Sequence, residues 1–278
     1  CSSDLFKMAR SLFIVLAIVL ATVCAAGDWV NKDVSRVIDA KTHIVNVKVV
    51  VKAKAGKNGA ESYVFLIPRE KMSHVSFYSV SVKGEEVKTS PVDIEREDAF
   101  AISVPMKVGP KEVVEFVFNI VLSNLLEPYP KEIDQLSEQL VLLKGHLYFW
   151  TPYFTKTQNT EVLLASGKIE SRTESDELEV NDDSLLYGPF DDVKAFSDEE
   201  LKVHFMTDAP FLTLYFVERE IEISHWGNVA VEEHVGATHS GAKLSGPFSR
   251  LDYQMRRQAE TGPSFRKLKA MVPHEATD

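Results

Sequence analysis

Apolar and polar residues alternate in short runs over most of the chain. The runs are rich in β-branched residues, and turn-forming segments such as 56–59, 83–85 and 108–110 separate them. An alternation with a period of two predicts strands that bury one face. Short strands at this spacing favour an antiparallel β-sandwich over alternating strands and helices. In the first part of the chain we expect strands at 42–51, 62–67, 75–82, 99–104, 113–122, 141–150 and 160–165.

The pattern breaks near the middle of the chain. The segment Glu127-Pro128-Tyr129-Pro130 carries two prolines too close together to sit inside a sheet. After it, Ile133, Leu136 and Leu140 recur at helical spacing. The sequence therefore predicts a short helix over 131–140.

An acidic stretch follows the first group of strands. Residues 173–200 contain eleven acidic residues and one basic residue, Lys194. This composition predicts an exposed loop or a connector between domains. Beyond it we expect a second set of strands at 201–205, 211–217, 220–224 and 228–235.

Together these elements predict a mainly β fold, with tandem antiparallel β-sandwich-like domains and a few short helices. We expect a first β domain at 27–170, an acidic connector at 171–200 and a second β domain at 201–278. We expect the second domain to be incomplete.

The amino-terminal stretch has the three parts of a secretory signal peptide. A short basic start from Met8 to Arg10 precedes an apolar run over 12–24, and Cys24-Ala25-Ala26 supplies small residues for cleavage. The run is shorter than the roughly 20 apolar residues of a spanning helix. A membrane anchor or a buried core helix is the alternative. We expect residues 8–26 to be a signal peptide and 1–7 to be a non-native leader.

Charge and cysteine content narrow the function classes. The formal net charge of −10 argues against nucleic acid or anionic lipid as the main partner. Both cysteines, Cys1 and Cys24, precede the predicted mature chain. Disulfides and thiol catalysis are therefore excluded for the mature product, which must rest on hydrophobic cores.

A group of histidines is the strongest candidate for metal binding. His225, His234 and His239 lie close in sequence, with Glu232 and Glu233 beside the second. The H-E-x-x-H zinc motif places a glutamate between two histidines of one helical face. Here both glutamates precede His234 and neither lies between the two histidines. Gly236, which lies between His234 and His239, also disfavours a helix. We expect histidines of loops and strand edges, and no metal site.

Other signatures of catalysis are missing from the sequence. The acidic pairs at 182–183 and 191–192 lack the alternate spacing of a calcium-binding EF-hand loop. The chain contains no G-x-S-x-G nucleophile elbow and no glycine-rich phosphate loop. We predict no catalytic, cofactor-binding or metal-binding residue, and no cofactor.

Aromatic residues concentrate at 148–154, in the string YFWTPYF. Such residues build stacking platforms for sugars or peptides, and they also build ordinary sandwich cores. We expect mainly core positions, with a contact role left open because Pro152 suggests a surface corner.

Several strings resemble the ribophorin I family. They are SHWGNVAVEE at 224–233, GPFSRLDYQ at 246–254, PYP at 128–130, TPYFTKTQ at 151–158 and YGPF at 187–190. The resemblance covers nearly all of the chain after the signal peptide, and the first two strings are long and unusual.

The resemblance implies an accessory, non-catalytic subunit of the oligosaccharyltransferase complex of the endoplasmic reticulum. That complex transfers a dolichol-linked oligosaccharide to asparagine of nascent polypeptides, and another subunit carries the active site. The implied partners are the other subunits, including the catalytic one, with the nascent polypeptide and the translocation channel as further candidates, and no nucleic acid. The implied location is the luminal side of the endoplasmic reticulum membrane, with type I topology through a transmembrane helix that this chain lacks. Both β domains would then be luminal.

Two other readings stay open at this point. The chain could be a secreted β-sandwich binding module that uses the aromatic residues at 148–154. It could also be the non-catalytic arm of a secreted peptidase, whose zinc motif would follow in a longer sequence.

Overall fold

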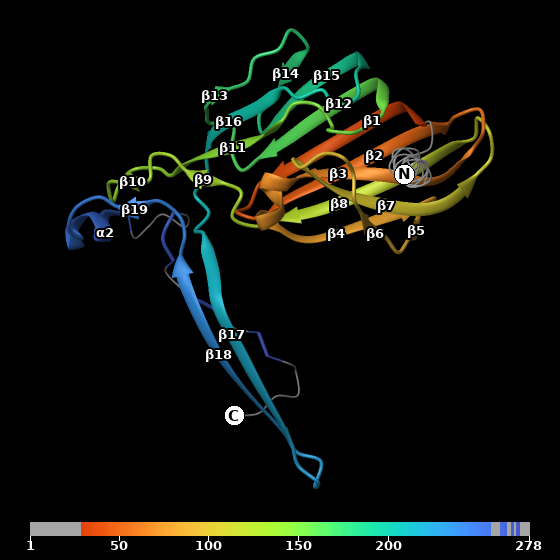
Figure 1. The fold of residues 1–278 in the computed structure, drawn as a ribbon. Coiled ribbons are helices and arrows are strands. Elements are labelled where there is room, and N and C mark those ends of the chain that lie inside the picture. The colour runs from red at the N-terminus through yellow and green to blue at the C-terminus, as the bar shows by residue number, and fades with distance from the viewer. Residues whose placement is uncertain (1–28, 257–261, 266–267, 270, 273–278) are drawn as a thin grey trace, which may run out of the picture.

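The computed structural model describes residues 29–256, 262–265, 268–269 and 271–272, which form a mainly β structure (Figure 1). This confirms the predicted fold class. The predicted leader at 1–7 and signal peptide at 8–26 lie outside the described residues. The described helices are short, η1 (Arg69–His74) and α2 (Arg250–Arg256). None of the helices in the described part of the chain is long and apolar enough to span a membrane.

One large sheet underlies the body of the molecule. Its strands follow the order β14-β15-β12-β1-β2-β8-β4-β5. Neighbouring strands are antiparallel except β1 and β12, which run parallel, a pairing that the antiparallel prediction did not include. The strands are β1 (Trp29–Ala40), β2 (Val45–Ala55), β4 (Val75–Val82), β5 (Glu85–Glu86), β8 (Val113–Leu122), β12 (Phe154–Leu164), β14 (Leu178–Val180) and β15 (Ser184–Val193).

Two smaller sheets cover the same face of the large one, side by side. Val34 and Ile38 project from one face of β1, and Val34 belongs to one buried cluster while Ile38 belongs to another. Each cluster is therefore a separate core between the large sheet and one small sheet. The first small sheet contains β3 (Ala60–Pro68), β7 (Ala99–Val108) and β6 (Ser90–Val92), and the second contains β13 (Ile169–Arg172), β16 (Glu200–Met206), β11 (Leu140–His146) and β9 (Glu127–Pro128).

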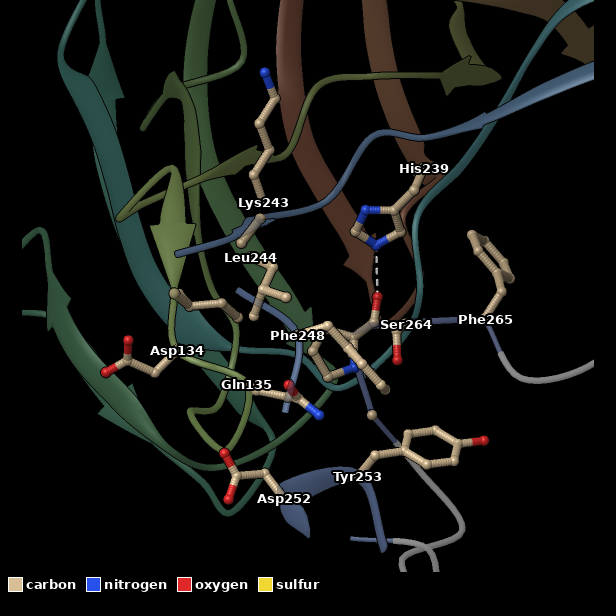
Figure 2. A pocket seen from close by; sticks show the side chains of 14 residues that line it. Asp134, Gln135, His239, Lys243, Leu244, Phe248, Asp252, Tyr253, Ser264 and Phe265 are labelled. Carbon is tan, nitrogen blue, oxygen red and sulfur yellow. Dashed lines mark hydrogen bonds between the residues drawn. The ribbon is translucent and has the colours of Figure 1, made fainter. Parts of the chain in front are cut away.

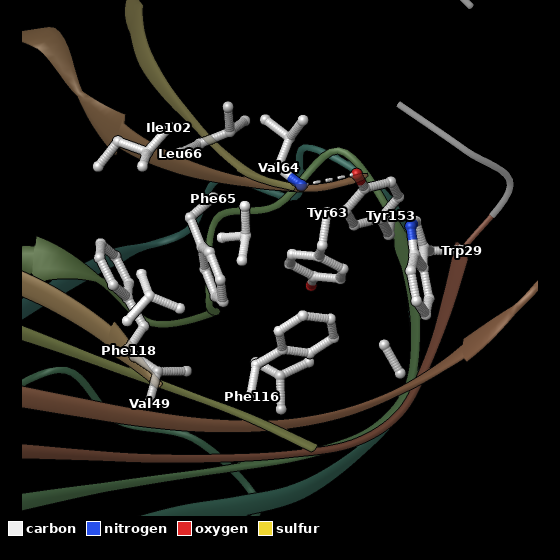
Figure 3. Packing of buried hydrophobic residues seen from close by; sticks show 14 of the residues in the cluster. Trp29, Val49, Tyr63, Val64, Phe65, Leu66, Ile102, Phe116, Phe118 and Tyr153 are labelled. Atoms are coloured by element: carbon white, nitrogen blue, oxygen red, sulfur yellow. Dashed lines mark hydrogen bonds between the residues drawn. The ribbon is translucent and has the colours of Figure 1, made fainter. Parts of the chain in front are cut away.

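Aromatic rings fill the first core (Figure 3). The ring of Tyr63 lies 4.4 Å from that of Phe116 and 4.8 Å from that of Tyr153, measured between centroids. Phe65 stacks on Phe118 at 4.6 Å. Burial raises the pKa of both the Tyr63 and the Tyr153 hydroxyl, so both stay neutral donors and acceptors.

A buried arginine lies where the two cores meet. Arg36 of β1 donates to the carbonyl oxygens of Tyr148 at 2.9 Å, His146 at 2.6 Å and Leu147 at 2.6 Å. Burial lowers the pKa of its guanidinium to about 9, because the charged form loses its water. The arginine thus fixes the backbone that follows β11 against the large sheet.

A long two-stranded hairpin leaves this body (Figure 1). It consists of β17 (Leu212–Ile223) and β18 (Val229–His239), which pair with each other. At its base β10 (Glu132–Ile133) pairs in parallel with β19 (Lys243–Leu244), and α2 lies beside them. The predicted strands at 211–217 and 220–224 are thus one continuous strand.

The helix predicted over 131–140 is wrong. Glu132–Ile133 forms β10, and β11 begins at Leu140. Ile133 is buried and pairs with Leu244, whereas Leu136 is half exposed. A partner strand more than a hundred residues away decided the conformation, and local spacing could not show that partner.

The acidic stretch is not simply a loop. It contains β14 and β15, and β15 pairs with β12 in the large sheet. Leu185 and Tyr187 of β15 are fully buried, and the Tyr187 hydroxyl donates to the Thr173 carbonyl at 2.9 Å. The acidic residues lie on the exposed positions around these apolar ones, so composition alone concealed the strand.

The division into domains at 27–170, 171–200 and 201–278 stays a prediction. Strands β12 and β15, from the two sides of the first boundary, share a sheet. Strand β16 begins at Glu200 and pairs with β11. This pairing favours one body that runs from β1 through β16, from which the hairpin extends (Figure 1).

Candidate functional site

A pocket lies where the base of the hairpin meets the body (Figure 2). Its volume is about 340 Å³, and its walls come from β10, β19, α2 and residues 262–265. Most of the lining is apolar. The apolar side chains include Ile133, Leu244, Phe248, Tyr253, Pro263 and Phe265.

The helix beside the pocket is held by an amide side chain. Gln135 donates from Nε2 to the Ser249 carbonyl at 2.8 Å and accepts from the Ser249 amide at 2.8 Å. The Ser249 hydroxyl in turn accepts from the amide of Asp252 at 3.2 Å, which is the bond of a helix N-cap. These bonds fix the start of α2, and with it Phe248 and Tyr253, against the loop after β10.

A second amide side chain holds the strand that leaves the hairpin. Gln139 is fully buried and accepts from the Ala242 amide at 2.8 Å through Oε1. Its Nε2 lies 3.4 Å from the carbonyls of Thr207 and Ala209. One side chain thus joins the chain that enters the hairpin to the chain that leaves it.

The pocket includes a histidine and a serine, and one ring nitrogen of the histidine is already engaged with backbone. Nε2 of His239 lies 2.6 Å from the carbonyl of Pro263. A carbonyl oxygen only accepts, so this nitrogen carries the proton and cannot deprotonate Ser264. The geometry suits an apolar group held by contact, with backbone and amide groups fixing its walls.

The three histidines that were considered as metal ligands are spread along the hairpin. His225 is in the turn, His234 pairs with Glu218 in the middle of the ladder, and His239 pairs with Leu212 at its base. At about 3.3 Å per residue, the last two are about 16 Å apart. His234 lies 3.1 Å from the carboxylate of Glu232. Within the described residues, no group of three or more His, Cys, Asp and Glu side chains is arranged to hold a metal ion.

The aromatic segment 148–154 is mainly core. Phe149, Trp150 and Tyr153 are buried in the first core, and the Tyr153 hydroxyl accepts from the Val64 amide at 3.0 Å. Rings in these positions cannot stack on a sugar or a peptide. The sandwich-core interpretation of this segment is therefore confirmed for those three residues.

Sequence reasoning missed the amides that shape the pocket. Gln135 and Gln139 belong to no motif, since any surface glutamine looks the same in a sequence. Phe248 and Tyr253 did carry a signal, because both lie in the family-like string at 246–254. The string indicated a family but no role for these two residues. In the structure, Phe248 and Tyr253 line the pocket.

The fold and the pocket together define a mainly β protein with a largely apolar pocket at the base of a long hairpin. The chain belongs to the ribophorin I family, whose model matches residues 29–278.

Relatives with curated names support the same membership. The chain is 33% identical over 276 residues to dolichyl-diphosphooligosaccharide–protein glycosyltransferase subunit 1 of Caenorhabditis elegans, with 97% of this chain and 46% of the relative covered. It is 29% identical to subunit 1A of Arabidopsis thaliana, with 95% of this chain and 45% of the relative covered. The chain thus spans about half the length of these relatives.

Solved structures resemble the chain only loosely. A putative nutrient binding protein from Legionella pneumophila matches with a TM-score of 0.45 and 9% identity, over 66% of this chain and 69% of that one. Yeast LTA4 hydrolase matches with a TM-score of 0.41 and 7% identity, over 67% of this chain and 30% of that one. Likenesses at this level carry no argument about function.

Proposed function

We propose that this chain is the amino-terminal luminal part of subunit 1 of the oligosaccharyltransferase, and that it has a non-catalytic role. The observation that carries the proposal is the family match over 29–278, together with relatives named as subunit 1 of this glycosyltransferase. In this role the chain helps to organise the complex and to present nascent polypeptide to a different, catalytic subunit.

The pocket supports a role in contact. Two of its polar side chains hold backbone, as the bonds from Gln135 to Ser249 and from His239 to Pro263 show. Most of the remaining lining is apolar, and Asp134, Lys243 and Asp252 add charge at the pocket. A net charge of −10 further favours protein partners over nucleic acid.

The proposed location follows from the signal peptide expected at 8–26. It would direct the chain into the endoplasmic reticulum with its β domains in the lumen. A transmembrane helix in the longer protein would hold it at the membrane, with type I topology. The other subunits are then the main partners, and the translocation channel and the nascent chain are further ones.

The test of a non-catalytic role is an activity assay on the isolated chain. The purified chain, supplied with dolichol-linked oligosaccharide and an acceptor peptide, should give no glycopeptide, while the purified complex gives product. Glycopeptide formed by the isolated chain would overturn the non-catalytic role and leave the family membership unaffected.

A further inference from the structure

An exposed row of side chains, mostly apolar, crosses the large sheet on the face opposite the first core. The row runs over four neighbouring strands, β8, β2, β1 and β12 (Figure 1). Val113 lies opposite Lys54, Lys54 lies opposite Val30, and Val30 lies opposite Phe154. Val113 is 52% exposed, and Val30 and Phe154 are each 38% exposed, whereas the next residue on β8, Val114, is buried in the core. Contiguous exposed apolar side chains with a polar rim are typical of contact surfaces.

Three lysines lie within and beside this row. Lys32 of β1 and Lys156 of β12 directly follow Asn31 and Thr155, which are ladder neighbours with buried side chains. Alternation along a strand therefore places Lys32 and Lys156 side by side on the exposed face, and both are exposed. Within the described residues, no ion pair involves either of them or Lys54. We call Val30, Lys32, Lys54, Val113, Phe154 and Lys156 the lysine patch.

Two acidic residues on the same side of the sheet lie beside a different lysine. The carboxylate of Asp33 is 3.5 Å from Nζ of Lys52, and Glu115 lies opposite Lys52 in the ladder. The lysine patch thus keeps a local positive charge on a chain whose formal net charge is −10. Like charges at neighbouring positions of a sheet repel each other, so a negatively charged partner would offset the repulsion between Lys32 and Lys156.

We propose that the lysine patch docks an acidic segment of another subunit of the oligosaccharyltransferase. Carboxylates of that segment accept charge-assisted hydrogen bonds from the three lysines, and its apolar side chains pack on Val30, Val113 and Phe154. Charge complementarity carries this choice of partner. The acidic chain as a whole repels an anionic lipid surface, whereas a protein segment brings negative charge to the patch alone. The proposal rests on the proposed function and names the chemistry of one partner contact.

A zero-length carbodiimide cross-linker tests the proposal, because it joins a lysine amine to a carboxylate only where the two groups meet. It is applied to the oligosaccharyltransferase purified from its natural source, in which this chain is part of the full-length subunit. Mass spectrometry should find amide links from Lys32, Lys54 or Lys156 to Asp or Glu of another subunit. Lys88 and Lys107 are exposed outside the lysine patch and should give no link to that segment.

Two matched aromatic variants test whether the apolar part of the patch is needed. Phe154 and Phe77 are both exposed on the large sheet, but Phe77 pairs with Val121, at the other end of β8 from the patch. In the full-length subunit, Phe154→Ala should lower the yield of links from Lys32 and Lys156 at least about fivefold, as truncation of an interface anchor does. Phe77→Ala should leave that yield unchanged.

Three results would overturn this proposal alone. An intact complex without links from the three lysines would show that no acidic segment lies on the patch. Links only to acidic residues of the same subunit, or of a second copy of it, would make that chain the occupant. Equal yields from Phe154→Ala and Phe77→Ala would show that the apolar row makes no contact. A full-length subunit that purifies without any other subunit would instead refute the proposed function, and this proposal with it.

Discussion

Replacement of Arg36 gives the sharpest test of how the two cores are joined. Its guanidinium is fully buried and donates to the carbonyls of His146, Leu147 and Tyr148. Hydrogen bonds from a charged group contribute roughly 1.5–3 kcal/mol each, so three contribute about 6 kcal/mol. A pKa lowered from 12.5 to about 9 by burial corresponds to a cost of about 5 kcal/mol for holding the charge. The hydrogen-bond figure is already net of lost hydration, so this cost is what a buried charge without the same three bonds would not recover.

An apolar replacement of Arg36 should therefore be more stable than a replacement that conserves the positive charge. Arg36→Met removes both the bonds and the buried charge, and the Leu147 carbonyl keeps a donor in the Thr160 hydroxyl at 3.1 Å. The carbonyls of His146 and Tyr148 lose this donor, so the expected cost is about 2–3 kcal/mol. Arg36→Lys keeps a buried charge but cannot reproduce the planar fork that reaches three carbonyls. Its expected cost is about 3–5 kcal/mol, limited by the ability of the lysine to become neutral.

Urea denaturation of the two variants and the unmodified chain measures the free energies of unfolding. The account predicts that Arg36→Met is the more stable variant. If Arg36→Lys is as stable as the unmodified chain, or more stable than Arg36→Met, the reasoning about desolvation at this position is refuted.

Three further perturbations have expected outcomes. Phe116→Ala should lower the unfolding free energy by about 3–5 kcal/mol, because the Phe116 ring is fully buried. Phe154 is partly exposed on the same sheet, so Phe154→Ala should lower it by under about 1 kcal/mol, and equal losses would contradict the assigned core. Gln139→Leu should leave the Ala242 amide without its 2.8 Å acceptor and should therefore speed proteolysis at the base of the hairpin. An unchanged rate of cleavage would show that this bond does not hold the base of the hairpin in place. Between pH 10 and 12 stability should fall, because burial raises the pKa of Tyr187 to about 12, and also raises that of Tyr63 and Tyr153, while the unfolded chain releases these protons near 10. Tyr187→Phe should make the fall less steep, and an identical pH profile would argue against burial of Tyr187 as a cause.

The pattern of apolar and polar residues predicted several strands with their observed bounds. The strands at 75–82 and 113–122 have the bounds expected of them; β8 buries alternating residues such as Val114, Phe116 and Phe118, whereas only Val80 is buried in β4. The strand at 184–193 was missed because acidic residues surround its buried Leu185 and Tyr187. The helix expected at 131–140 failed because β10 depends on a distant partner strand.

The candidate site was harder to predict than the fold. Resemblance marked the string at 246–254, and the structure showed that Phe248 and Tyr253 within it line a pocket. Gln135 and Gln139 have no sequence signature, since their roles depend on carbonyl and amide groups brought close by folding. Pairing between distant strands, which sets these positions, is not encoded in any local pattern.

The central proposal is that this chain belongs to a non-catalytic subunit of the oligosaccharyltransferase, which helps to organise the complex. The direct measurement uses cells that lack subunit 1 and express a tagged, full-length Caenorhabditis elegans relative carrying residues 29–278 of this chain in place of its matched region. The account predicts that the tagged protein co-purifies with the catalytic subunit and restores N-glycosylation of a reporter. A tagged protein that is folded and luminal, but purifies without the catalytic subunit and leaves the reporter unglycosylated, would contradict it.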